Sequence, residues 1–134
     1  MTSTVIYEGD LHTNAKHLQS GSAIETDAPT DNKGRGERFS PTDLIATGLG
    51  ACMATTMGIK ANDLGVDLRG LTVDVTKHMV AGPRRIGGID IHLRFPQGLE
   101  LDEKQRAILE NTARTCPVIY SLHPDIQVNT EISW

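Results

Sequence analysis

Apolar and polar residues alternate along several short stretches of the chain, and this pattern predicts β-strands. Residues 71–78 and residues 89–95 show the alternation most clearly. Turn-forming residues separate them, at 81–85 and at Gly87 and Gly88, so we expect an antiparallel hairpin. Further extended segments are expected at Thr4–Tyr7, Ser22–Thr26 and Ile126–Trp134.

One long helix is predicted from Ser40 to about Asn62. Ser40 suits the cap, Pro41 suits the first turn, and Asp43 can accept a hydrogen bond from the Ser40 backbone. Gly65 is expected near the C-terminal end. We expect one buried face, with Cys52 on or beside it, because residues recur at helical spacing at Ile45, Leu49, Cys52, Thr56 and Ile59.

The remaining segments complete an α+β prediction with a mainly antiparallel sheet. Residues 27–38 form a polar loop, whose proline, glycine and asparagine content is expected to exclude regular structure. Asp102 can cap a helix from Glu103 to about Arg114, and a short helix is expected to begin near Cys116 and Pro117. A chain of 134 residues is expected to form a single domain, over residues 1–134.

Composition and charge exclude several classes of protein. The hydrophobic share of 38% is ordinary for a globular chain, and the net charge of −4 argues against binding nucleic acid through its phosphates. No run of 18 apolar residues is present, so no membrane segment is expected. The first residues lack the basic and apolar regions of a signal peptide, so we expect a cytoplasmic protein.

The candidate chemistry depends on two cysteines, Cys52 and Cys116. Both can be inert thiols in the core. Alternatively, Cys116 precedes Pro117 near a helix N-terminus, where backbone N–H groups favour the thiolate. The five histidines are scattered without metal-ligand spacing, at His12, His17, His78, His92 and His123. We therefore expect neither a metal nor a cofactor.

Two segments resemble one known family. Residues 39–53, FSPTDLIATGLGACM, resemble the helix signature of the OsmC/Ohr family, named for osmotically inducible protein C and organic hydroperoxide resistance protein. Residues 116–122, CPVIYSL, resemble its second cysteine segment, and the order of the predicted elements matches over nearly the whole chain. The resemblance implies an OsmC-like fold with a long central helix that carries Cys52. It also implies an intertwined homodimer with active sites at the subunit interface.

The activity that the resemblance implies is a thiol peroxidase, acting on organic hydroperoxides in oxidative stress defence. Cys52 would attack the peroxide and become a sulfenic acid, and Cys116 would resolve it as an intrachain disulfide. A dithiol reductant such as dihydrolipoamide, often protein-bound, would then restore both thiols.

The chain departs from the family pattern beside the predicted nucleophile. In the well-studied branches a glutamate follows the helix-start proline and orients an arginine; here that position is Thr42, and the next residue, Asp43, is expected to cap the helix. Arg35 and Arg38 are the only arginines before Cys52, and Arg38 is preferred because it lies closer to the helix.

Two other hypotheses remain open at this point. One is a non-enzymatic OsmC-fold protein that binds a small apolar or acyl ligand, with its thiols sensing redox state or taking no part. The presence of Thr42 favours it, and the pair of cysteines opposes it. The other is a purely structural domain.

Overall fold

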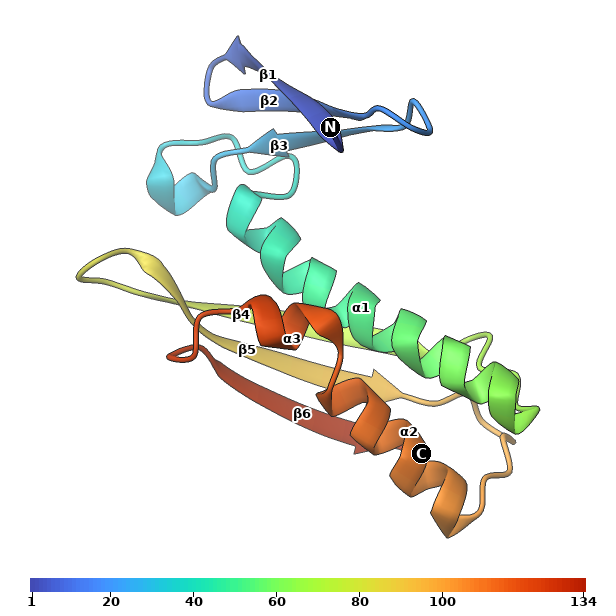
Figure 1. Ribbon diagram of the computed structural model, residues 1–134. Coiled ribbons are helices and arrows are strands. Elements are labelled where there is room, and N and C mark those ends of the chain that lie inside the picture. The colour runs from blue at the N-terminus through green and yellow to red at the C-terminus, as the bar shows by residue number, and fades with distance from the viewer. The chain divides into compact units, whose positions relative to one another are not determined.

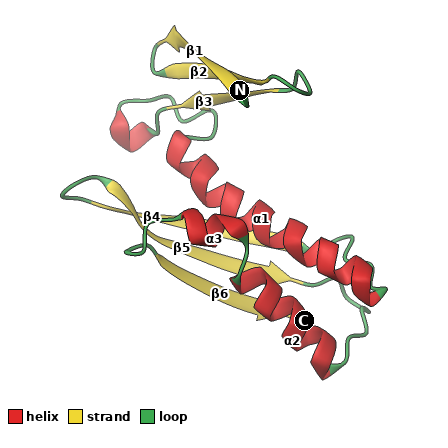
Figure 2. Cartoon of the chain, in the orientation of Figure 1, coloured by secondary structure: helices red, strands yellow, loops and turns green.

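The computed structural model describes all of residues 1–134, and the chain forms two compact units, Met1–Ile45 and Ala46–Trp134. Helix α1 (Pro41–Leu64) continues without a break across the boundary between them, as Figure 1 shows. Each unit contains its own three-stranded sheet, and Figure 2 shows the strands and helices by colour.

The first unit contains the N-terminal sheet, formed by β1 (Ser3–Gly9), β2 (His12–His17) and β3 (Ala23–Asp27) in that order, all antiparallel. The predictions for β1 and β3 are confirmed, whereas β2 was not predicted. A short 3₁₀-helix, η1 (Thr30–Asn32), follows and corrects the expectation that residues 27–38 have no regular structure. It closes because the Asn32 N–H donates to the Pro29 carbonyl at 2.9 Å.

The two faces of the N-terminal sheet differ in chemistry. Val5 lies opposite Ala15, and Ala15 lies opposite Ile24, so these residues share an apolar face. Tyr7 is on the same face because it is two positions from Val5. The opposite face carries the polar and charged side chains of His12, Asn14, Glu25 and Asp27.

The second unit contains the C-terminal sheet, formed by β4 (Thr72–Val80), β5 (Arg85–Arg94) and β6 (Gln127–Ser133). The expected hairpin is confirmed as antiparallel β4 and β5, while β6 pairs with β5 in parallel. Gly87 and Gly88, expected in the turn, lie within β5, where a Cβ on Gly87 would collide with the Val80 side chain. The predicted α+β class is thus confirmed, with one antiparallel and one mixed sheet.

Two helices lie between β5 and β6 along the chain and make the parallel pairing possible. Helix α2 (Glu103–Arg114) begins with the predicted Asp102 cap: Asp102 Oδ1 accepts from the Gln105 N–H, and the Asp102 N–H donates to Gln105 Oε1. Helix α3 (Pro117–Ser121) is one short turn that starts directly after Cys116. In Figure 1, α1, α2 and α3 cover one face of the C-terminal sheet.

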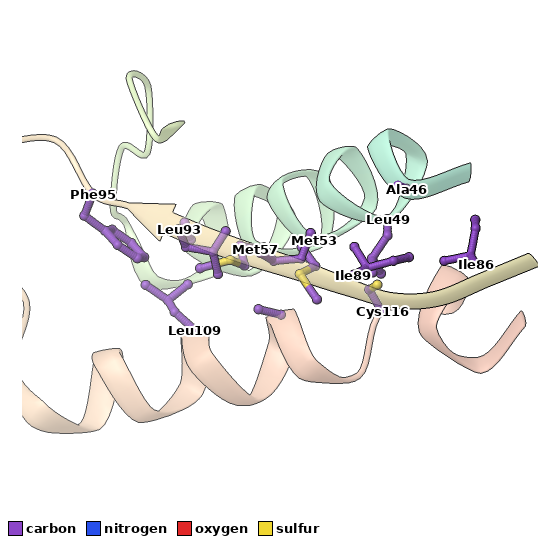
Figure 3. Close-up of a cluster of buried hydrophobic side chains, with 13 residues drawn as sticks. Ala46, Leu49, Met53, Met57, Ile86, Ile89, Leu93, Phe95, Leu109 and Cys116 are labelled. Carbon is purple, nitrogen blue, oxygen red and sulfur yellow. The ribbon is translucent and has the colours of Figure 1, made fainter. Parts of the chain in front are cut away.

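The apolar core belongs to the second unit, and Figure 3 shows its members converging between α1, β5 and α2. The buried face of α1 differs from the predicted one: Ile45 is 50% and Ile59 62% exposed. The buried residues of α1 are Ala46, Leu49, Gly50, Met53, Met57 and Ala61. The prediction failed because α1 carries apolar or small residues around much of its circumference, so spacing alone does not select a face.

By length and composition alone, α1 could cross a membrane. Its Leu49, Met53 and Met57 side chains instead join the core with the isoleucines of β5. Such packing is ordinary for the central helix of a folded domain, so the length of α1 is weak evidence for a membrane segment.

Candidate active site

Cys52 lies in the middle of α1, and the start of this helix is fixed locally. The Ser40 N–H donates to Asp43 Oδ2 at 2.9 Å, and the Asp43 N–H donates to Ser40 Oγ at 3.1 Å. This reciprocal cap confirms the predicted helix start. The helix ends at Leu64, before Gly65 with a φ of +69°.

The position of α1 against its sheet depends on Gly50. A Cβ at Gly50 would lie 2.8 Å from Val75 Cγ2 and 3.2 Å from Val73 Cγ1, so a larger residue would push the helix away from β4. Cys52 is two residues further on, half-buried, and packs against the edge of the core. Cys52 therefore contacts the core while part of the residue stays accessible.

Cys116 lies at the N-terminal cap of α3 and is 1% exposed. Pro117 occupies the first turn, and the Ile119 N–H donates to the Cys116 carbonyl at 3.1 Å. In Figure 3 the Cys116 side chain points into the core beside Ile89 and Leu49. The thiol is thus enclosed by apolar side chains and the first turn of a short helix.

The structure brings the two predicted cysteines together. Cys52 packs against the core cluster that contains Cys116, it lies near enough to act on the pKa of the Cys116 thiol, and both cysteines are free. Burial is the main reason that the pKa of Cys116 is raised above its ordinary value of 9.0, and the neighbouring Cys52 raises it further. The backbone N–H groups at the start of α3 lower this pKa, as expected from the sequence, but burial has the larger effect.

Arg38 lies in the first unit, in the loop after β3. Its Nε donates to Glu25 Oε2 at 3.1 Å, and its Nη1 donates to the Glu37 carbonyl at 3.0 Å. The Glu25 carboxylate raises the pKa of Arg38 further, so the guanidinium is always charged. Cys52 belongs to the second unit, and assistance of Cys52 by Arg38 therefore stays a prediction.

The other sequence candidates near the helix start have local roles. Arg35 donates to Asp10 Oδ2 at 3.4 Å, and both side chains are largely exposed. Thr42 Oγ1 lies 3.2 Å from Ser40 Oγ, beside the cap in which Asp43 takes part. The expectation that Asp43 serves as the capping partner is confirmed.

Sequence reasoning missed a charged cluster on the polar face of the N-terminal sheet. His12 Nδ1 lies 2.6 Å from Asp27 Oδ1, and His12 Nε2 lies 3.2 Å from Glu25 Oε1. Together with the Arg38 loop, these side chains line a pocket of about 280 Å³. One feature of the sequence could have indicated this cluster: Glu25 and Asp27 are two positions apart on a strand, so their side chains lie on the same face.

Comparison with known sequences and structures points to one family. The sequence profile described as OsmC-like protein matches residues 34–131. A search of curated proteins found no match. A crystal structure from Psychrobacter arcticus, of a protein described as an osmotic stress induced and detoxification response protein, is 54% identical with a TM-score of 0.94. That match covers 99% of this chain and 96% of the other.

More distant structures share the fold. The organic hydroperoxide resistance protein OsmC from Legionella pneumophila is 18% identical with a TM-score of 0.76, and the match covers 100% of this chain and 98% of the other. The organic hydroperoxide resistance protein OhrB of Bacillus subtilis is 17% identical with a TM-score of 0.66, and the match covers 99% and 98% of the two chains.

Proposed function

Because this chain belongs to the OsmC-like protein family, we propose that it is a cysteine-based peroxidase that reduces organic hydroperoxides. The single observation that carries this proposal is that folding brings the two cysteines, 64 positions apart in the sequence, into one core cluster as free thiols. The names of the distant structural neighbours, which refer to organic hydroperoxide resistance, support the choice of substrate. The proposal extends to a role in oxidative stress defence.

In the proposed reaction, Cys52 is the attacking residue because it is the more exposed of the two cysteines. Its thiolate attacks one peroxide oxygen, the O–O bond breaks, and the departing alkoxide takes a proton to become an alcohol. Cys52 becomes a sulfenic acid. A thiolate is required for this attack, and we assign Arg38 to support it with positive charge.

Cys116 resolves the sulfenic acid in the second step. Its raised pKa keeps it a thiol until then, so it does not compete for the peroxide at neutral pH. After losing its proton, its sulfur attacks the Cys52 sulfur, hydroxide leaves and is protonated to water, and an intrachain disulfide forms. A dithiol reductant of the lipoyl type then returns both cysteines to thiols and is itself oxidised to a disulfide.

Assembly as a homodimer is part of the proposal. The apolar face of the N-terminal sheet is uncovered, with Val5 61%, Tyr7 64% and Ile24 53% exposed. Helix α1 also has open positions, since a Cβ on Gly48 or Gly58 would meet nothing within 4 Å. A second copy of the chain would cover both surfaces. We further propose a single OsmC-like domain over residues 1–134 and a cytoplasmic location.

Thr42 favours a second candidate function. It stands where the resemblance leads us to expect a glutamate, and its hydroxyl lies 3.2 Å from Ser40 Oγ beside the helix cap. A protein without peroxidase activity, which binds a small apolar ligand and uses its thiols as a redox sensor, would not need that carboxylate.

Hydroperoxide consumption by the full chain with dihydrolipoamide tests the proposal. We expect Cys52→Ser to abolish turnover, because a serine hydroxyl is not ionised at neutral pH. Cys116→Ser should react once and then gain oxygen as the unresolved sulfenic acid is oxidised further. Stoichiometric cumene hydroperoxide should lower the intact mass of the wild-type chain by about two hydrogens, as a disulfide requires. Equal consumption by wild type and Cys52→Ser would favour the ligand-binding protein instead.

A further inference from the structure

The carboxylate of Glu25 is bonded on both of its oxygens. Oε2 accepts from Arg38 Nε at 3.1 Å, and Oε1 lies 3.2 Å from His12 Nε2. Arg38 is bonded a second time, through Nη1 to the Glu37 carbonyl at 3.0 Å. Two bonds to different parts of a planar guanidinium fix its orientation as well as its position.

His12 connects this pair to a buried anchor. Its Nδ1 lies 2.6 Å from Asp27 Oδ1, and the Asp27 side chain is 4% exposed. An ionised carboxylate can only accept hydrogen bonds, so His12 must carry a proton on both nitrogens to serve Asp27 and Glu25 together. A continuous series of bonds therefore runs from buried Asp27 through His12 and Glu25 to Arg38.

We propose that Glu25 is the positioning residue for Arg38, in place of the carboxylate that Thr42 does not supply. This inference rests on the proposed function, in which Arg38 supports Cys52. Two other acidic residues of this region have bonds of a different kind: Asp43 accepts from the Ser40 backbone N–H, and Glu37 accepts from Arg38 through its main-chain carbonyl. Glu25, by contrast, bonds to the guanidinium through its side-chain carboxylate.

Strand β3 explains why Glu25 can act in this way. β3 is bonded to β2 over its length, with Asn14 opposite Glu25 and His12 opposite Asp27. The backbone of Glu25 is therefore held by a sheet, whereas Arg38 lies in a loop. A carboxylate on a sheet restricts a loop guanidinium more than a second loop residue would. The charged and titratable groups that line the shared pocket are Glu8, Asp10, His12, Glu25, Asp27, Arg35, Glu37 and Arg38.

The test is a double-mutant cycle on the full chain, with Glu25→Gln, Arg38→Gln and the double variant. The measured quantity is the bimolecular rate of Cys52 oxidation by cumene hydroperoxide in a single turnover. We expect Arg38→Gln to slow it about a hundredfold and Glu25→Gln about tenfold, since misplacing a supporting group costs rates of this order. The double variant should be no slower than Arg38→Gln, because Glu25 acts only through Arg38.

A second readout does not depend on activity. The Nε–H proton of Arg38 should exchange slowly with water in the wild type, so that its ¹H–¹⁵N resonance is observed. In Glu25→Gln the proton should exchange fast and the resonance should be lost. Glu25→Asp keeps the charge on a shorter side chain and should recover part of the rate; it also replaces Glu25→Gln if that variant does not fold. Glu8→Gln is the matched control, because it removes one charge from the same pocket and Glu8 contacts His12 rather than Arg38.

Loss of both the protected resonance and the rate in Glu25→Gln, with no additional loss in the double variant, would support the inference. A wild-type rate in Glu25→Gln, or losses that multiply in the double variant, would overturn it. An unchanged Nε–H resonance in Glu25→Gln would also overturn it. Failure of the proposed function is recognised separately, by a Cys52→Ser variant that consumes hydroperoxide as fast as the wild type.

Discussion

The two units of the chain are stabilised by different interactions. The buried residues of the first unit are all polar or charged, namely Thr26, Asp27 and Ser40. The second unit buries apolar side chains from α1, β5 and α2, together with the Cys116 thiol. Hydrogen bonds and ion pairs hold the first unit, whereas close packing holds the second.

This difference separates the two parts of the proposed chemistry. The thiols lie in the packed unit, where burial raises the pKa of Cys116 and Cys52 packs against the same core cluster. Arg38 and its carboxylate lie in the unit without an apolar core, where the bonded groups are charged and partly exposed. Apolar packing therefore positions the two cysteines that react with each other. Ion pairs and hydrogen bonds position Arg38, which supplies positive charge in the proposed reaction.

The largest effect is expected from a cavity in the packed unit. Leu49→Ala removes a side chain that is fully buried on α1 and should lower the free energy of unfolding by about 2–5 kcal/mol. Leu18→Ala, in the first unit, should change it by no more than about 0.5 kcal/mol, because Leu18 is 42% exposed. Urea unfolding followed by Trp134 fluorescence measures both. Equal losses in the two variants would contradict the contrast between the units.

The next prediction concerns the uncovered apolar face of the N-terminal sheet. The wild type should sediment as a dimer of two 14.5 kDa chains at low micromolar concentration. Ile24→Asn places a polar group on the apolar face and should shift the equilibrium toward monomer about tenfold or more, because burying an unpaired amide is costly. Ile6→Asn, on the opposite face, is the matched control. A folded 14.5 kDa wild-type monomer would show that this face needs no partner.

A third prediction concerns the difference in reactivity between Cys52 and Cys116. Iodoacetamide at pH 7 should modify Cys52 at least about tenfold faster than Cys116, because only thiolates react and burial raises the pKa of Cys116. The Cys116 rate should climb with pH well into the alkaline range. Peptide mass spectrometry gives both rates, and the urea-unfolded chain, in which the two rates should converge, is the control. Faster modification of Cys116 in the folded protein would exchange the proposed roles.

Much of the fold could be predicted from sequence because its signals are local. The caps at Ser40 and Asp102 are formed by residues three positions apart, so they are visible in the sequence before folding. Strand β2 was missed because its sequence, HTNAKH, contains a single apolar residue, Ala15, and gives no alternation. It forms because β1 and β3 bond to it on both sides, which is a tertiary effect.

The candidate site could be predicted only in part for a related reason. Cys52 and Cys116 were identified from the segments around them, but their contact depends on how α1 and α3 pack. Glu25 gave no signal of its own, since it lies 13 residues before Arg38 and meets it only after β3 and the following loop have formed. Residues whose roles come from folding, rather than from a local motif, remain invisible to sequence patterns.

The smallest expected effect is the pH dependence of the first unit. The Asp27 and Glu25 carboxylates raise the pKa of His12 above its ordinary value of 6.5. The stabilisation by protonated His12 is therefore fully present below pH 6.5 and is lost as pH rises through the higher pKa of the folded state. The pKa values of Asp27 and Glu25 are lowered by His12 and Arg38 respectively, so both carboxylates stay ionised through this range.

Amide hydrogen exchange in β2 and β3 can detect this effect, with wild type and His12→Gln compared at equal pH. We expect slower exchange in the wild type at pH 6, and a difference that shrinks toward pH 8.5 as His12 loses the proton that lets it bond to both carboxylates. His17→Gln is the control, because His17 lies on the same strand and bonds instead to Ser20 at 2.7 Å. Exchange in β5 should not change, since apolar packing holds that strand. A difference that is constant from pH 6 to 8.5 would mean that His12 does not join the two carboxylates through its protonated form.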